Sequence, residues 1–166
     1  PMELLSPHAQ EGTHHYDMSP RAQYAFHRFS NSKGQRVSDW ISTAGHKTIK
    51  PVQSQLQPQR ADHPEVKMFQ ITTEDAVTMD GWMILPKNFD SSKKYPVLFF
   101  VYAEPAGATV KDADGSAGTR LYKGDIAADG YIQISLDGRG TPAPKGAAWR
   151  KAIYRKVGIV NSRDQA

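Results

Sequence analysis

Cysteine is absent from this 166-residue chain, which excludes a disulfide framework, a cysteine nucleophile and thiolate metal sites. Long hydrophobic runs are also absent. The longest strongly apolar stretch, residues 96–102, is far shorter than the roughly 20 residues that a membrane span needs. The sequence therefore predicts no membrane span. No signal-peptide pattern follows Pro1, so we expect that any export signal of the protein lies upstream.

The composition is that of an ordinary globular protein. Hydrophobic residues make up 39% of the chain and charged residues 23%. Lys and Arg outnumber Asp and Glu by 21 to 17, giving a net charge of +4, which permits an acidic partner without requiring one. On length alone, the chain is one domain or pieces of two.

Short β-rich segments separated by turn residues dominate residues 1–50. They cover residues 13–18, 24–30 and 36–43. This spacing is typical of an antiparallel meander, such as half of a sandwich or one propeller blade. Residues 51–65 contain three prolines and four glutamines, and we interpret them as a linker.

A different pattern follows over residues 66–166. Residues 66–73 and 77–85 predict an antiparallel pair, and the apolar run 95–102 predicts a strand covered on both faces. Residues 131–136 predict another strand. Helices are expected over 119–129 and 147–157, the second with Trp149, Ile153 and Val157 on one face. Alternating strands and helices indicate an α/β sheet with crossover connections.

No complete catalytic triad of the α/β-hydrolase type is present in this sequence. A Gly-x-Ser-x-Gly motif is absent, and all six histidines lie at or before His63, whereas that fold places its histidine last. The histidines also lack metal-ligand spacing: His14 and His15 are adjacent, and His27, His46 and His63 are isolated. We therefore interpret them as ordinary strand and loop residues and predict no metal site.

Two further motifs favour structural roles. Residues 138–143 match G-x-G-x-x-A, but Pro142 and Pro144 delay the helix that would bind a dinucleotide. The basic segment 145–156, which includes Trp149 and Tyr154, has the composition of a nucleic-acid contact, yet a solvated helix face explains it better. We expect no nucleic-acid partner and no cofactor.

Several segments, in the same order along the chain, resemble the dipeptidyl peptidase IV branch of the prolyl oligopeptidase family of serine peptidases. They are Glu11-Gly12-Thr13-His14, Ser19-Pro20, Phe26-His27-Arg28-Phe29-Ser30, Asp80-Gly81-Trp82-Met83-Ile84, Lys94-Tyr95-Pro96-Val97, Val101-Tyr102 with Pro105, Asp137-Gly138-Arg139-Gly140 and Asp164-Gln165. No one segment is specific for this family, but their collinear order over nearly the whole chain is specific for it.

The resemblance implies an α/β fold in which the N-terminal part of an α/β-hydrolase sheet is preceded by antiparallel strands of a last β-propeller blade. Residues 1–50 would be the blade and residues 66–166 the start of the catalytic domain, ending before the nucleophile. Such enzymes release N-terminal dipeptides, preferably Xaa-Pro, through an acyl-enzyme. This chain alone lacks the serine, aspartate and histidine and should be inactive.

One catalytic residue is implied by the resemblance. Tyr102 matches the family's tyrosine, whose hydroxyl completes the oxyanion hole. The family commonly has glycines after this tyrosine, where this sequence has Ala103 and Glu104, and the acidic residue usual before the terminal Asp-Gln is Arg163 here.

The resemblance also sets expectations for partners. They are a peptide substrate, the remaining propeller and hydrolase parts, and a homodimer or association through exposed strands. The full-length protein would be exported to the periplasm or cell envelope. The alternative is a non-catalytic binding module that uses the basic 145–156 helix.

Overall fold

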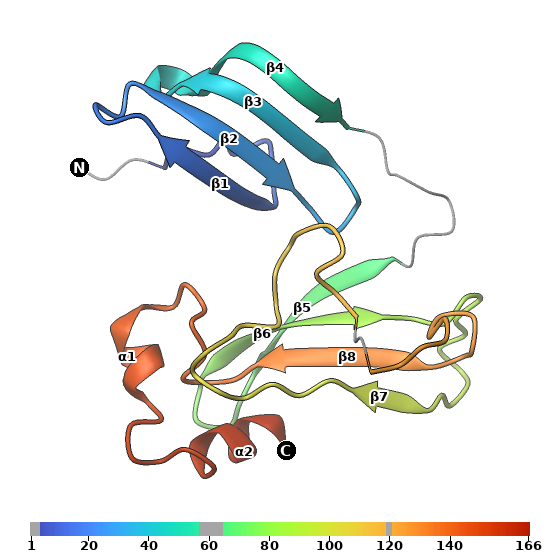
Figure 1. Ribbon diagram of the computed structural model, residues 1–166. Helices are drawn as coiled ribbons and strands as arrows, with labels where there is room; N and C mark the ends of the chain where they lie inside the picture. Colours follow the sequence, from blue (N-terminus) through green and yellow to red (C-terminus); the bar gives the residue numbers. More distant parts are fainter. Residues whose placement is uncertain (1–3, 57–64, 119–120) are drawn as a thin grey trace. The chain divides into compact units, whose positions relative to one another are not determined.

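The computed structural model describes residues 4–56, 65–118 and 121–166. The chain forms two compact units, residues 1–63 with 112–115 and residues 64–111 with 116–166. The described part consists mostly of strands in two four-stranded sheets, with few helices (Figure 1).

The first unit contains an antiparallel sheet with the order β1-β2-β3-β4. Its strands are β1 (Thr13–Met18), β2 (Tyr24–Ser30), β3 (Arg36–Ser42) and β4 (Lys47–Gln55). Side chains of β2 alternate, so that Ala25, His27 and Phe29 are buried, and Asp39 and Ile41 of β3 are buried as well. The three expected strands are confirmed, and the buried face of this sheet is partly polar.

The linker expected at 51–65 starts too early, because residues 51–55 belong to strand β4. The strand continues through Gln55, and Pro51 lies opposite Asp39 at a register shift. Proline is tolerated there because β4 is the last strand of the described sheet and need not donate a ladder hydrogen bond on its free side. The rest of the expected linker, residues 57–64, lies outside the described residues, as does His63.

The second unit contains a mixed sheet with the order β5-β6-β8-β7. Its strands are β5 (Val66–Thr72), β6 (Thr78–Ile84), β7 (Val97–Phe99) and β8 (Ile132–Asp137). β6 is antiparallel to β5 and β8, whereas β7 and β8 are parallel. The expected antiparallel pair at 66–85 and the strand at 131–136 are confirmed.

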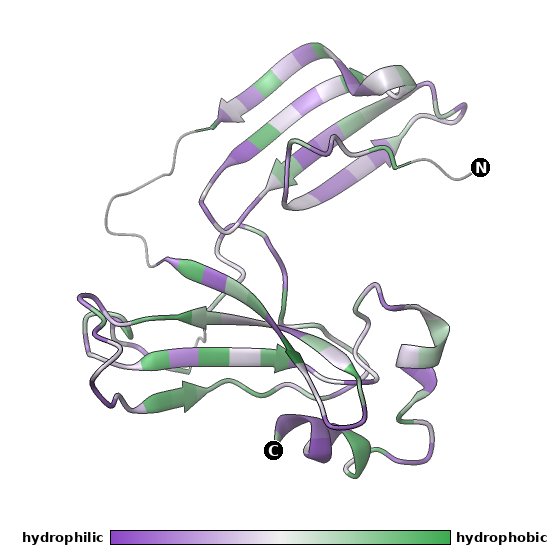
Figure 2. Ribbon diagram, turned by 180° about the vertical axis from the view of Figure 1, so that it is seen from behind, coloured by the Kyte–Doolittle hydropathy of each residue, from purple (hydrophilic) through white to green (hydrophobic). Residues whose placement is uncertain are grey.

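Hydrophobic residues concentrate in the strands of the second sheet, whereas those of the first sheet alternate more with polar residues (Figure 2). Trp82, Ile84 and Ala127 form a buried cluster, with Phe100 and Val110 among the residues packed on it. This core gives the segments on both sides of β7 an apolar surface to lie against.

The apolar run at 95–102 is less regular and less buried than expected. Its ladder covers only β7, although the Phe100 N–H still donates to the Ile134 carbonyl at 2.8 Å. Val97, Val101 and Tyr102 are exposed. Because these side chains are exposed, the prediction of a strand covered on both faces is wrong for this structure. Among the described residues, no further strand pairs with the outer edge of β7.

The two expected helices also differ from the prediction: one is absent over the described residues and the other is shorter. Residues 121–130 form turns, and Gly124 weakens a helix there. Residues 119 and 120 lie outside the described residues. Helix α1 (Gly146–Lys151) is shorter than expected. The chain continues in turns, in which the Tyr154 N–H donates to the Lys151 carbonyl at 3.0 Å and Arg155 has a positive φ of 56°. Trp149 and Ile153 are buried as expected, but Val157 is exposed.

A second helix, α2 (Val160–Gln165), was not expected from the sequence. Asn161 and Asp164 on it are buried, although both are polar. Within the described residues, no helix has the length and apolar character needed to cross a membrane.

Gly81 lies where the second sheet has no room for a larger side chain. A Cβ at this position would lie 2.5 Å from Phe69 Cζ and 2.7 Å from Leu136 Cδ2, on the two flanking strands. Overpacking of this kind costs about 1–3 kcal/mol, so Gly81→Ala should lower the free energy of unfolding by that amount in a urea titration. The control Ser91→Ala, in an exposed turn, should change it by less than about 0.5 kcal/mol. An unchanged midpoint for Gly81→Ala would show that the strands are not so closely packed.

Candidate functional site

Tyr102 lies just past the carboxyl end of β7. Because β7 and β8 are parallel, the loop that carries Tyr102 and the Asp137–Gly140 turn begin at the same edge of the sheet. Among the described strands, β7 and β8 are the parallel pair, and Tyr102 lies at the edge formed by their carboxyl ends.

The backbone on both sides of Tyr102 is held by polar side chains. The Ser135 hydroxyl, which is fully buried on β8, donates to the Phe100 carbonyl at 2.7 Å. The Asn161 amide on α2 donates to the Ala103 carbonyl, also at 2.7 Å. These two hydrogen bonds limit how far the backbone at Tyr102 can move.

The far end of the same loop is held by Asp137. This carboxylate is 1% exposed and accepts the Thr109 N–H at 2.7 Å and the Val110 N–H at 3.1 Å. The Trp82 indole N–H also donates to the Thr109 carbonyl at 2.9 Å. The loop between Tyr102 and Thr109 is thus fixed at both ends by buried groups.

The Tyr102 side chain is 38% exposed and packs against Gly107 of its own loop. A Cβ at Gly107 would lie 2.9 Å from Tyr102 Cε1. None of the described residues hydrogen-bonds the Tyr102 hydroxyl, which leaves this O–H available as a donor. Glu104, two residues on, is exposed.

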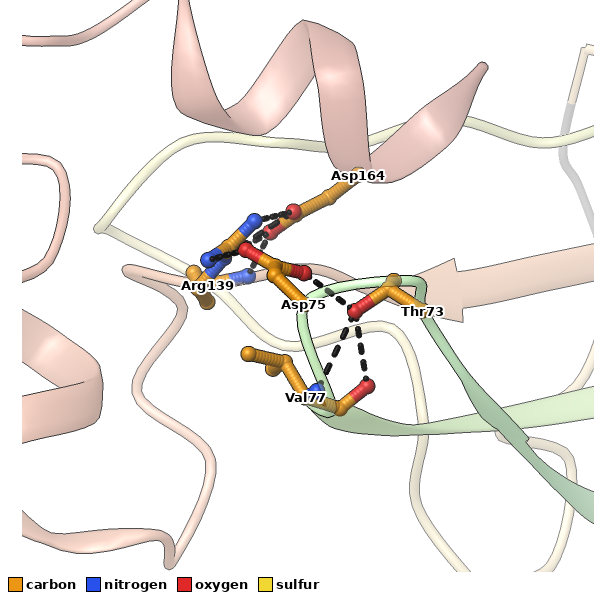
Figure 3. A network of polar contacts seen from close by, with 5 residues as sticks. All are labelled: Thr73, Asp75, Val77, Arg139 and Asp164. Carbon is orange, nitrogen blue, oxygen red and sulfur yellow. Dashed lines mark hydrogen bonds and ion pairs between the residues drawn. The ribbon is translucent and has the colours of Figure 1, made fainter.

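Arg139 forms an ion-pair network next to this edge (Figure 3). Its guanidinium donates to Asp164 of α2 at 2.5 Å and to Asp75 of the β5–β6 turn at 2.7 Å, and its backbone N–H donates to Asp164 at 2.7 Å. The two sequence segments that contain Arg139 and Asp164, far apart in the chain, are therefore structural partners. The network joins the β5–β6 turn, the turn after β8 and α2.

Hydrogen bonding shifts the pKa values in this network. The hydrogen bond from the Thr73 hydroxyl, followed by that from Arg139, lowers the pKa of Asp75 to about 2. Hydrogen bonding to Asp164 raises the pKa of Arg139 above its usual value, against the effect of desolvation. Arg139 stays charged and offsets two carboxylates, one of them fully buried.

The other motifs of the second unit have structural roles. Gly140 has a φ of 95°, and a Cβ there would collide with Ile153, so this glycine serves close packing. Lys145 pairs with Asp80 at 2.9 Å and donates to the Thr78 carbonyl. The helical part of the basic segment is only six residues long. None of these features favours a binding helix over residues 145–156.

Three histidines of the first unit come together, which sequence spacing did not predict. The ligand nitrogens of His14, His27 and His46 lie within 4.8 Å of one another. His14 and Tyr16 share a face of β1, and Tyr16 pairs with His27 of β2. The strand register, rather than the linear spacing, is the signal that could have revealed the cluster.

Burial shifts the pKa values of His27 and of the neighbouring Tyr16. It lowers the pKa of His27 below its usual value, opposed by the hydrogen bond to Asp39. Burial also raises the pKa of Tyr16 to about 12, with the Asp39 charge adding to the effect. Neutral forms of both side chains are therefore favoured.

The chain is similar in sequence to curated dipeptidyl peptidases. No family model matches it. Dipeptidyl peptidase 4 of Trichophyton rubrum is 33% identical over 102 residues, which are 61% of this chain and 13% of that protein. The "Probable dipeptidyl-aminopeptidase B" of Ajellomyces capsulatus strain H88 is 37% identical over 101 residues, or 61% of this chain and 11% of that protein.

Two crystal structures resemble this one. A candidate dipeptidyl aminopeptidase IV from Bacteroides ovatus has a TM-score of 0.80 and 28% identity, and dipeptidyl peptidase 4 of Porphyromonas gingivalis has a TM-score of 0.76 and 26% identity. Each match covers 93% of this chain and 22% of the other chain. The resemblance seen in the sequence is confirmed: the chain is similar, in sequence and in structure, to part of these dipeptidyl peptidases.

The low pKa of Asp75 makes the stability of the fold depend on pH in the acid range. The folded pKa of about 2 lies below the usual 3.8, so folding favours the ionised carboxylate. This contribution is complete above about pH 4 and is lost as the pH falls toward 2. Asp75→Asn should therefore be less stable than the unmodified chain at pH 6, and the difference should shrink between pH 4 and pH 2 in urea titrations.

The neighbouring exposed carboxylate Glu74 provides the control. Glu74→Gln should follow the unmodified chain across this pH range. A difference between Asp75→Asn and the unmodified chain that stays constant from pH 6 to pH 2 would contradict the ion pair with Arg139.

Proposed function

We propose that this chain is part of a serine-type dipeptidyl peptidase that releases N-terminal dipeptides, with a preference for Xaa-Pro. In this proposal, residues 1–50 belong to the last blade of a β-propeller and residues 66–166 begin an α/β-hydrolase domain. The similarity to dipeptidyl peptidases in both sequence and structure supports the proposal.

The observation that carries the proposal is the position of Tyr102. β7 is the third strand of the second sheet along the chain, and Tyr102 lies three residues after its last residue. In α/β-hydrolases, the loop after the third strand supplies part of the oxyanion hole. A phenol O–H is a suitable donor at this place because it can point at the oxygen that becomes negatively charged during peptide-bond cleavage.

The surroundings of Tyr102 suit this role. An oxyanion donor lowers the barrier most when it is held in place before the reaction, so that no reorganisation is needed. The hydrogen bonds from Ser135 and Asn161 hold the adjacent backbone, and Gly107 leaves room for the ring. The proposed mechanism is nucleophilic attack by a serine, with Tyr102 donating to the oxygen of the tetrahedral intermediate.

The serine, aspartate and histidine of this mechanism would come from sequence that this chain does not contain. The chain spans 13% or less of the curated relatives described above. A Gly-x-Ser-x-Gly motif encoded downstream of Ala166 would agree with the proposal, since the nucleophile of α/β-hydrolases lies on such a turn.

The first test compares the full-length protein with its Tyr102→Phe variant on a dipeptidyl-proline chromogenic substrate. Loss of one oxyanion donor should reduce kcat by about 10²–10³-fold with little change in KM. The control Tyr154→Phe removes an exposed hydroxyl in the same unit and should leave both constants unchanged. Unchanged kcat in Tyr102→Phe would exclude the oxyanion role, and equal losses in both variants would indicate a general structural effect.

The second test concerns the 166-residue chain itself. Without a serine nucleophile on a suitable turn, it should show no turnover of the same substrate above the buffer rate. A serine-directed fluorophosphonate should also fail to label it. Turnover that the fluorophosphonate abolishes would contradict this assignment of the nucleophile to other sequence.

A further inference from the structure

Three imidazoles meet on the buried face of the first sheet. His14 comes from β1, His27 from β2 and His46 from the short 3₁₀ turn η1 (Ala44–His46) between β3 and β4. His27 is 1% exposed, whereas His14 and His46 are partly exposed, so the cluster is open to solvent on one side. Imidazole nitrogens are common ligands of zinc and related divalent metals.

Outer hydrogen bonds determine which nitrogens carry protons. His14 Nε2 lies 2.8 Å from the Gln10 carbonyl oxygen, which can only accept, so His14 Nε2 carries the proton. His27 Nδ1 lies 2.8 Å from Asp39 Oδ1, and the Thr48 hydroxyl donates to the other oxygen of that carboxylate. His27 Nδ1 therefore also carries a proton. In neutral rings, the remaining nitrogens then present lone pairs.

These two remaining nitrogens face each other. His14 Nδ1 and His27 Nε2 are 2.9 Å apart, and the two ring planes differ by only 16°. Two lone pairs at this distance repel unless a positive ion lies between them. That ion is either a shared proton, which charges the pair, or a metal ion that both nitrogens bind.

The outer partners match those of a metal site. Metal-binding histidines usually donate their second N–H to a carboxylate or a backbone carbonyl, and Asp39 and Gln10 do this here. His46 Nε2 supplies a third nitrogen, and the Tyr16 hydroxyl, 3.0 Å from it and 3.4 Å from His14 Nδ1, lies next to the fourth position. Zinc–nitrogen bonds of about 2.0–2.1 Å need ligand atoms roughly 3.3 Å apart, which small ring rotations can reach.

We propose that His14, His27 and His46 bind one Zn²⁺ ion in the first unit, with the Tyr16 hydroxyl or a water molecule as fourth ligand. The metal replaces the shared proton, which leaves to solvent. It connects β1, β2 and the turn after β3, and the nearby Asp39 carboxylate balances part of its charge. The site depends only on the first unit and not on the peptidase proposal.

The test uses the 166-residue chain after removal of metal with EDTA. Zn²⁺ is titrated at pH 7.5 in competition with a chromophoric chelator, and Co²⁺ is added separately to record its visible spectrum. We expect one Zn²⁺ per chain, an intense tetrahedral Co²⁺ absorption and a higher Tm with Zn²⁺. His14→Ala and His46→Ala should each weaken Zn²⁺ binding by at least about 100-fold, more than the 10–100-fold typical for the loss of an outer partner.

The matched control is His15→Ala. His15 neighbours His14 on β1 but points to the opposite face, is 60% exposed and pairs with Asp17. This variant should bind Zn²⁺ like the unmodified chain. If circular dichroism shows that His14→Ala is unfolded, the Zn²⁺ affinity of His46→Ala is the deciding measurement. His46 lies on a short turn outside the strands, so its replacement should leave the sheet folded.

Three results would overturn the proposal. They are absence of one-to-one Zn²⁺ binding by the unmodified folded chain, binding that His46→Ala leaves unchanged, and binding that His15→Ala weakens as much as His46→Ala. The first result would identify the shared proton as the ion between His14 and His27.

Discussion

Hydrogen bonds from buried side chains hold the loop that follows β7, and the candidate site depends on them. This loop leaves the β-ladder after Phe100, so its backbone groups need other partners. Ser135, Asp137 and Asn161 supply them from β8 and α2. Removing one such partner leaves a buried group unpaired, at a cost of about 1–3 kcal/mol. The same hydrogen bonds that stabilise the second unit therefore also position Tyr102.

Polar side chains on a buried face have a comparable effect in the first unit. Asp39 on β3 accepts hydrogen bonds from His27 on β2 and from Thr48 on β4, so one carboxylate connects three strands. Its contact with His27 also fixes the tautomer of that ring, which determines the nitrogen that faces His14. In both units, a buried aspartate orders the groups around the candidate ligand-binding side chains.

The sequence predicted the strands better than the helices for a physical reason. Alternating apolar residues with turn residues between them define strands locally, and most of these agree with the structure. The helix expected at 119–129 is absent over the described residues, where Gly124 disfavours a helix, and after Lys151 the chain makes turn hydrogen bonds in place of further helix. The histidine cluster depends on strand register, which linear spacing does not show. Tyr102 could be singled out only through the family resemblance, because its position depends on long-range hydrogen bonds.

A crystal structure of the full-length protein with a dipeptide boronate bound as a tetrahedral adduct would show directly whether Tyr102 is an oxyanion-hole donor. A boronate oxygen should lie 2.7–3.1 Å from the Tyr102 hydroxyl, the range of an oxyanion-hole hydrogen bond. The Asn161 and Ser135 hydrogen bonds to the loop should persist in the adduct. A bound adduct whose oxygens all lie beyond hydrogen-bond reach of Tyr102 would exclude this role.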